Sequence, residues 1–145
     1  MQQELNLRKM KEENKYYVPE IEEFFVGFEV ENRLTKHDLW IECITEADLL
    51  DNVLDDYEHH PNDVPDLYRV KYLSKQCIEE LGFKFEGDKL SKGIQDEFRK
   101  GEFILTYHYP SKTLYIETII EYIVSNITIK SKNELKKLLK QLNIK

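Results

Sequence analysis

Residues 55–63 gather carboxylate and imidazole side chains, the groups with which proteins bind metal ions. The candidate ligands in this segment are Asp55, Asp56, Glu58, His59, His60 and Asp63. Zinc takes histidine and carboxylate ligands, and calcium takes carboxylate oxygens. The spacing fits neither metal, because adjacent histidines point in different directions in an extended chain and the glycine of a calcium loop is missing. We therefore predict no metal and no other cofactor, and interpret the segment as a solvated acidic loop or as a partner-binding surface.

The charge pattern places this segment inside a longer acidic region. Residues 38–68 contain ten Asp and Glu and no Lys or Arg, whereas residues 130–145 contain six Lys and one Glu. Affinity for a phosphate backbone comes mainly from Lys and Arg, so direct binding of nucleic acid is not expected. One interpretation of the acidic region is a solvated surface. The other is that it imitates the row of phosphate charges along DNA and occupies a basic groove on another protein.

No spacing in the sequence indicates catalysis. Ser91 and Ser111 lie in no nucleophile motif, and the five glycines are too far apart to form a phosphate-binding loop. Cys77 falls on the apolar face of an expected helix, and His108 alternates with strand residues that face the core, so packing is the favoured role of both. Carboxylates are abundant, but only geometry can select an acid and a base among them. A non-enzymatic protein is the favoured interpretation, and a weak hydrolase that uses the acidic segment is a minor alternative.

Tyrosine is the one enriched aromatic residue, with nine in the chain. Tyrosine favours wet interfaces, because its ring supplies contact area and its hydroxyl group finds a partner. Strand alternation places about half of the tyrosines of the last third in the core. Together with the acidic segment they give one candidate partner surface, which comprises Asp51, Asp55, Asp56, Glu58, His59, His60, Asp63, Tyr107, Tyr109 and Tyr115.

The last third of the chain has the clearest local pattern. Residues 103–109 and 114–119 alternate around a turn at Pro110, and a third strand follows at residues 123–129. Ser131 and Glu134 match a capping box, and four leucines then recur at helical spacing, so an amphipathic helix is predicted near 131–143.

The earlier residues predict further strands and helices. Strands are expected at 23–31, 39–44, 67–73 and 83–88, a short helix from Thr45 to about Leu54, and a loop at 55–66. A second helix near 74–81 begins at the capping residue Ser74 and ends at Gly82. We predict a polar N-terminal arm at 1–15 and a single α+β domain at 16–145, with a mostly antiparallel sheet of five to seven strands.

The composition indicates in which cellular compartment the protein is expected. The chain of 145 residues is 41% apolar and 34% charged, enough for one core beneath a well-solvated surface. No apolar run is long enough to span a membrane, and the N-terminus is too polar for a signal peptide. Cys43 and Cys77 match no metal or disulfide spacing, which favours a reducing compartment. We expect a cytoplasmic protein without a membrane partner.

Two short segments carry a resemblance to known proteins. They are YVPEIEEFFVGFEVE at residues 17–31 and IEELGF at residues 78–83, the latter followed by an aromatic hairpin, a strand and the capped leucine helix. This order resembles small uncharacterised proteins of phages and prophages of Bacteroidota-type bacteria. The resemblance implies an antiparallel sheet with packed helices and an accessory role in a mobile element, within the bacterial host cytoplasm. It transfers no activity and no active-site residue to this chain.

The function expected from these observations is binding. The leading hypothesis is a non-enzymatic accessory protein of a phage or mobile element that binds a host or phage protein, or a second copy of itself. One alternative is a protein that binds or sequesters a small ligand such as a nucleotide or metabolite. Another is a component of the virion or of its assembly.

Overall fold

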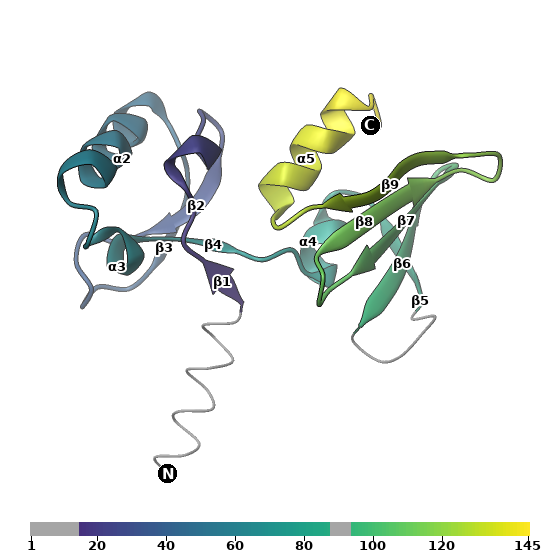
Figure 1. The fold of residues 1–145 in the computed structure, drawn as a ribbon, viewed down its shortest axis with the longest axis horizontal. Helices are drawn as coiled ribbons and strands as arrows, with labels where there is room; N and C mark the ends of the chain where they lie inside the picture. The colour runs from purple at the N-terminus through teal and green to yellow at the C-terminus, as the bar shows by residue number, and fades with distance from the viewer. Residues whose placement is uncertain (1–14, 88–93) are drawn as a thin grey trace, which may run out of the picture. The chain divides into compact units, whose positions relative to one another are not determined.

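The computed structural model describes residues 15–87 and 94–145, and these residues form two compact units, with the boundary along the chain between Tyr72 and Leu73. Each unit has its own antiparallel sheet and its own cluster of buried apolar side chains (Figure 1). The α+β class and the antiparallel pairing are confirmed. The strands are divided between sheets of four and five strands, whereas the sequence was interpreted as one sheet in one domain at 16–145. Apart from Lys15, the expected arm at 1–15 lies outside the described residues.

Unit 1, which ends at Tyr72, builds a four-stranded sheet in the order β1-β4-β2-β3. Its elements are β1 (Tyr16–Tyr17), η1 (Ile21–Glu23), β2 (Glu29–Asn32), β3 (Ile41–Ile44), α2 (Ala47–His59), α3 (Val64–Leu67) and β4 (Tyr68–Lys71). Helix α2 places its one fully buried residue, Val53, in a cluster with Phe28, Val30, Tyr68 and Val70. The helix therefore covers one face of this sheet.

The strand expected at 23–31 is shorter in the structure. Gly27 has a φ of 103°, and the backbone N–H of Phe28 donates to the carbonyl of Phe25 across 3.0 Å, so the chain turns before β2 begins at Glu29. The apparent alternation of Phe24, Val26 and Phe28 thus spans a turn, and Val26 is exposed. Glycine reaches this left-handed backbone conformation without a steric penalty, which is why the strand breaks there.

The loop expected at 55–66 is largely helical. Helix α2 continues to His59, and α3 begins at Val64 after a short turn. The continuation follows from the apolar face, because Tyr57 comes four residues after Val53 and packs against the same cluster. The loop was expected from the turn-forming residues around Pro61 and Pro65, but these residues follow the end of α2, and the exposed Asp55 and Glu58 lie within the helix.

Unit 2 begins at Leu73 and contains a five-stranded meander in the order β5-β6-β7-β8-β9. Its elements are α4 (Lys75–Glu80), β5 (Lys84–Gly87), β6 (Gln95–Lys100), β7 (Phe103–His108), β8 (Thr113–Glu117), β9 (Tyr122–Thr128) and α5 (Lys132–Gln141). The helices predicted near 74–81 and 131–143 are confirmed. Ser74 accepts the backbone N–H of Cys77 and Ser131 accepts that of Glu134, each across 3.3 Å, so both predicted caps are present.

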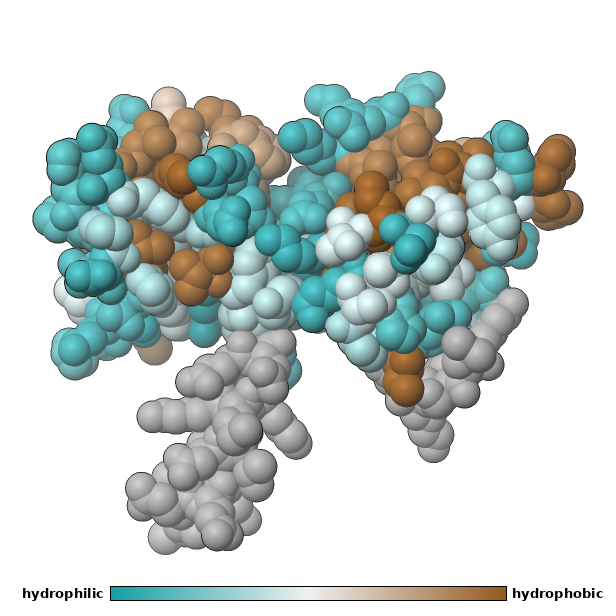
Figure 2. Space-filling model, viewed as in Figure 1, coloured by the Kyte–Doolittle hydropathy of each residue, from teal (hydrophilic) through white to brown (hydrophobic). Residues whose placement is uncertain are grey.

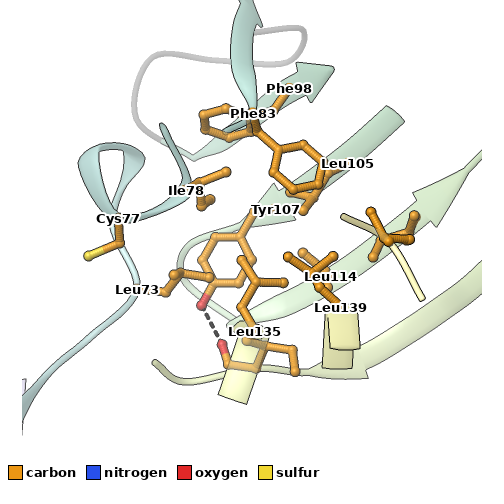
Figure 3. Packing of buried hydrophobic residues seen from close by; sticks show 13 residues of the cluster. Leu73, Cys77, Ile78, Phe83, Phe98, Leu105, Tyr107, Leu114, Leu135 and Leu139 are labelled. Carbon is orange, nitrogen blue, oxygen red and sulfur yellow. Dashed lines mark hydrogen bonds between the residues drawn. The ribbon is translucent and has the colours of Figure 1, made fainter. Parts of the chain in front are cut away.

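The core of unit 2 lies on one face of this meander (Figure 3). The sheet residues that it buries are Phe98, Leu105, Tyr107, Leu114 and Ile116, and they are covered by Cys77 and Ile78 of α4 and by Leu135 and Leu139 of α5. The predicted alternation of β7 and β8 is therefore confirmed. None of the helices in the described residues combines the length and apolar character that crossing a membrane requires.

Candidate functional site

Helix α2 separates apolar and acidic side chains onto different faces. Leu49, Val53 and Tyr57 recur at i, i+4 and i+8 and pack in the core of unit 1. Another face carries four exposed carboxylates at successive spacings of three, four and three residues, which brings them onto one line along the helix. We call this line the acidic stripe, and it consists of Asp48, Asp51, Asp55 and Glu58.

Beyond Asp48, which lies in the first turn and favours the helix dipole, the acidic stripe does not stabilise its own helix. Helix α2 contains no Lys or Arg, and the imidazole Nε2 of His59 lies 3.8 Å from Asp55 Oδ1 and 3.9 Å from Glu58 Oε2 at an exposed position. Like charges three or four residues apart destabilise a helix by about 0.2–0.5 kcal/mol per pair. A carboxylate at the C-terminal end, such as that of Glu58, also opposes the helix dipole. Helix stability therefore explains Asp48 but not Asp51, Asp55 or Glu58.

Asp56 lies next to the stripe in sequence but serves the core. The hydroxyl group of Tyr68 donates to Asp56 Oδ2 across 2.6 Å. Burial, then this hydrogen bond and the nearby carboxylate charge, raise the pKa of Tyr68 above its usual range. The neighbouring Tyr57 donates from its hydroxyl group to the carbonyl of Pro19, and burial is the main cause that raises its pKa. Asp56 is thus a structural residue in a surface that was predicted to bind a partner.

His60 and Asp63 lie in the turn that follows α2. The backbone N–H of His60 donates to the carbonyl of Asp56 across 2.8 Å, and that of Asp63 donates to the carbonyl of His60 across 3.0 Å. Both side chains are exposed beyond the end of the stripe. Across the described residues, no group of three or more His, Cys, Asp or Glu side chains is arranged to hold a metal ion.

The three tyrosines predicted for the partner surface do not form one patch. Tyr107 is only 1% exposed and donates to the carbonyl of Ile129 across 2.6 Å, so its inclusion in the surface was wrong (Figure 3). Tyr109 is half-buried and donates to Asp96 Oδ2 across 2.7 Å. Tyr115 alternates with the buried Leu114 and Ile116, so it projects from the opposite face of the sheet. All three belong to unit 2, and the acidic stripe belongs to unit 1.

A stack of aromatic rings and guanidinium groups was not anticipated from the sequence. The guanidinium carbon of Arg69 lies 3.7 Å from the ring centre of Tyr16 and 4.4 Å from that of Trp40. The guanidinium carbon of Arg33 lies 4.1 Å from the same Trp40 ring. Such contacts are worth about 0.5–2 kcal/mol each. The stack fixes Trp40 directly before β3, and no local signal could have shown it because its members are far apart in sequence.

Exposed aliphatic side chains are a second feature that the sequence did not separate from the core. In unit 1 they include Leu34, Leu39, Ile41 and Ile44, and in unit 2 Ile119, Ile120 and Ile127. Figure 2 shows apolar side chains among hydrophilic ones on both units, including those at the turn between β8 and β9, at the right edge of the view. Alternation identified β3 and β9 as strands, but it could not show that they lie at sheet edges.

The remaining reactive side chains have structural surroundings. His108 Nδ1 lies 2.6 Å from Ser111 Oγ, and it also accepts the backbone N–H of Ser111 across 3.3 Å, which closes the turn after β7. Burial raises the pKa of the Cys43 thiol, so that it is mostly protonated and a weak nucleophile at neutral pH. Cys77 is buried. Ser91 lies outside the described residues.

Comparisons of this chain with protein-family models, with curated protein sequences and with solved structures gave no match.

Proposed function

We propose that this protein acts by binding another protein that presents a basic surface, and that the acidic stripe is the centre of the contact. The observation that carries the proposal is the one-sided line of four carboxylates on a helix that contains no Lys or Arg. In keeping with the sequence resemblance, the protein serves as a non-enzymatic accessory protein of a phage or mobile element. Its partner is a host or phage protein.

The distribution of charge between the two units supports a basic partner. Residues 1–72 contain eight Lys and Arg against eighteen Asp and Glu, a net charge of −10, whereas residues 73–145 contain thirteen against ten, a net charge of +3. A surface dominated by one sign of charge steers an oppositely charged partner and repels partners of its own sign. Unit 1 therefore selects for basic proteins.

The spacing of the stripe is suited to a basic groove. Carboxylates three or four residues apart on a helix that rises 1.5 Å per residue recur about every 5 Å, over a length of about 15 Å. Phosphates along one strand of DNA recur at a comparable interval of about 3.4 Å along the helix axis. A groove that accommodates a row of phosphates offers cationic groups at suitable spacing, so a nucleic-acid-binding protein is the favoured class of partner.

Charge reversal on the stripe tests the proposal. Tagged wild-type protein and the double variant Asp51→Lys with Asp55→Lys are used to capture partners from bacterial lysate at low and high salt, with identification by mass spectrometry. A basic partner should be recovered by the wild type at low salt and lost with the variant, because attraction becomes repulsion. Asp56 is left intact because its carboxylate binds Tyr68.

A matched control separates position from total charge. The exposed residues Glu102 and Glu121 of unit 2 are both changed to Lys, which alters the net charge by the same amount. This control should recover the same partner as the wild type. Recovery of the same partner by the stripe variant, or its loss from both variants, contradicts the proposed role of the stripe.

A further inference from the structure

Among the strands that the structure describes, β3 has a partner on one side of its backbone only. It is the last strand in the order β1-β4-β2-β3 and pairs with β2 alone among the described strands. The N–H of Thr45 donates to the carbonyl of Phe28 across 2.8 Å, so Thr45 directs its backbone groups toward β2. Because these directions alternate along an antiparallel strand, Ile41 and Cys43 also bond to β2, whereas Glu42 and Ile44 direct their N–H and C=O groups outward.

This edge lacks several of the features that normally prevent strands from adding to a sheet. Natural edges are blunted by charged side chains, especially Lys, by Pro, by bulges, by very short strands or by a covering segment, and β3 shows two of these, its length of four residues and the exposed Glu42. The sequence of β3 is Ile-Glu-Cys-Ile, its register with β2 has no shift, and none of its residues has a positive φ. Ile41 and Ile44 are each 62% exposed, and Leu39 just before the strand is 87% exposed. Within the part of the chain that the structure describes, the edge is therefore regular and largely apolar, with Glu42 as its one charged side chain.

The edge strand is held in place on its inner side. Trp40 is stacked against Arg33 and Arg69 immediately before β3. The thiol of Cys43 donates to the carbonyl of Val30 across 3.3 Å. A strand that is already ordered loses little conformational entropy when another strand pairs with it, which favours binding by strand addition.

Charge determines which kind of strand fits this edge. Glu42 is exposed in the middle of β3, and Asp38 and Glu46 flank it. Pairing of two copies of β3 would bring these carboxylates together along with two units of net charge −10, and facing like charges destabilise a sheet. The edge therefore fits an incoming strand that places Lys or Arg near Glu42 and aliphatic side chains on the face of Ile41. The cation would pair with the carboxylate, and the aliphatic side chains would cover the exposed apolar surface.

We propose that β3 receives an extended segment of the basic partner as a fifth strand, and that this segment alternates basic and aliphatic residues. The inference rests on the proposed function, since the same acidic unit selects the partner. It adds the mode of binding, in which the backbone of Glu42 and Ile44 supplies hydrogen bonds while the acidic stripe supplies charge. The affinity then depends on the backbone of β3 as well as on carboxylates.

Two labelled peptides test the mode of binding with the full chain. The probe is an octapeptide of alternating Lys and Val, and its control is an octapeptide of alternating Lys and Gly with the same charge and little tendency to form strands. Binding is followed by fluorescence anisotropy. The Lys-Val peptide should bind at least about tenfold more tightly than the Lys-Gly peptide. Equal affinities would show that charge alone attracts the peptides, and would overturn strand addition.

Variants of Ile44 separate the backbone from the side chain. Of the backbone hydrogen-bonding groups, Ile44→Pro removes only the outward N–H, so no bond to β2 is lost; it also replaces the side chain. Proline is tolerated where an edge strand faces solvent. Ile44→Thr keeps that N–H and a β-branched side chain. Unchanged far-ultraviolet circular dichroism shows that both variants fold. Ile44→Pro should then lower the affinity for the Lys-Val peptide at least about tenfold, and Ile44→Thr should lower it less than about threefold. Equal affinities for wild type and Ile44→Pro overturn the inference.

Amide hydrogen exchange gives a readout that does not depend on any variant. Saturation with the Lys-Val peptide should slow exchange at Glu42 and Ile44, the amides that point outward, and leave Ile41 and Cys43 nearly unchanged because they already bond to β2. Unchanged exchange at Glu42 and Ile44 would overturn the inference. If the peptide contacts only the acidic stripe, Asp51→Lys with Asp55→Lys abolishes binding while Ile44→Pro does not. That result leaves the proposed function intact and rejects strand addition alone.

Discussion

The hydroxyl group of Tyr68 donates a hydrogen bond to the carboxylate of Asp56 across 2.6 Å. This contact joins helix α2 to strand β4 at the margin of the unit 1 core, where Tyr68 is buried. The preceding residue, Asp55, is exposed and belongs to the acidic stripe. Two adjacent aspartates of the same helix therefore have different roles, one in the fold and one on the surface.

Replacement of each aspartate by alanine should separate these roles. Asp56→Ala leaves the buried hydroxyl group of Tyr68 without its charged acceptor. It should lower the free energy of unfolding by about 1.5–3 kcal/mol, the contribution of a hydrogen bond to a charged group. Asp55→Ala removes an exposed carboxylate and should change the free energy of unfolding by less than about 0.5 kcal/mol. Urea denaturation at neutral pH measures both effects. Equal destabilisation by the two changes would contradict the assignment of Asp56 to the core.

The buried tyrosines should make the stability depend on alkaline pH. Burial, followed by a hydrogen bond to a carboxylate, raises the pKa of Tyr68 and of Tyr109 above the ordinary value of 10.0. Above about pH 10 the unfolded chain loses these protons while the folded chain keeps them. The free energy of unfolding is therefore undiminished below that pH and falls above it, by up to about 1.4 kcal/mol per pH unit for each such tyrosine.

Denaturation between about pH 8 and pH 11 tests this dependence. Tyr68→Phe removes one of the ionising groups, so its stability should decline less steeply with pH than that of the wild type, whatever its stability at pH 8. Tyr122→Phe, at an exposed position, is the control and should keep the wild-type slope. A slope that is the same for all three proteins would show that Tyr68 ionises alike in the folded and unfolded chain.

Local patterns in the sequence were sufficient where neighbouring residues determine the structure. The C-terminal helix was predicted because Ser131, Glu134 and the leucines that follow act within one or two turns. The alternation of residues 103–109 and 114–119 was predicted for the same reason, and the structure buries Leu105 and Leu114 in the core of unit 2. The end of α2 differs from the prediction, because the turn-forming residues around Pro61 favour a loop from Asp55 onward whereas the helix continues to His59. The packing of Tyr57, which extends the helix, depends on residues outside α2.

The candidate site was predicted only in part, because exposure depends on distant residues. Asp51, Asp55 and Glu58 are indeed exposed on α2, but Asp56 has a partner on β4, twelve residues away. Tyr107 was assigned to a surface because tyrosine favours wet interfaces. Its actual partner, the carbonyl of Ile129, lies twenty-two residues further along the chain, where no local pattern indicates it. Likewise, nothing near Ile44 in sequence indicates that β3 is the last strand of its sheet.

Removal of the Tyr107 hydroxyl group should destabilise unit 2. This group is the buried donor to the carbonyl of Ile129, which lies between β9 and α5. Tyr107→Phe leaves that carbonyl without this donor, at a cost of about 1–3 kcal/mol in the free energy of unfolding. Tyr115→Phe, on the opposite face of the same sheet, is the matched control, and its free energy of unfolding should fall by less than about 0.5 kcal/mol. A Tyr107→Phe protein as stable as the control would exclude a structural role for this hydrogen bond.

The cap of α5 should have a measurable and smaller effect. Ser131 Oγ accepts the backbone N–H of Glu134, and Glu134 Oε2 accepts the backbone N–H of Lys130 across 3.1 Å. Ser131→Ala removes the first of these bonds and should lower the free energy of unfolding by about 1 kcal/mol, whereas Ser131→Asp should retain most of it because aspartate also caps helices. Thermal denaturation distinguishes the two variants. Equal losses would indicate that the packing of the fully buried Ser131, and not its hydrogen bond, is what matters.

The two units should fold separately, and this prediction tests the interpretation of the chain as one domain. Every buried apolar residue of the unit 1 cluster precedes Tyr72, and every one of the unit 2 cluster lies at or after Leu73. A polypeptide of residues 73–145 retains its whole cluster and should melt cooperatively, with near-ultraviolet circular dichroism typical of packed tyrosines. Residues 15–72 bury a smaller cluster and, at fewer than 60 residues, should be the less stable piece. If residues 73–145 show no cooperative transition, the two sheets depend on each other and the single-domain interpretation is correct.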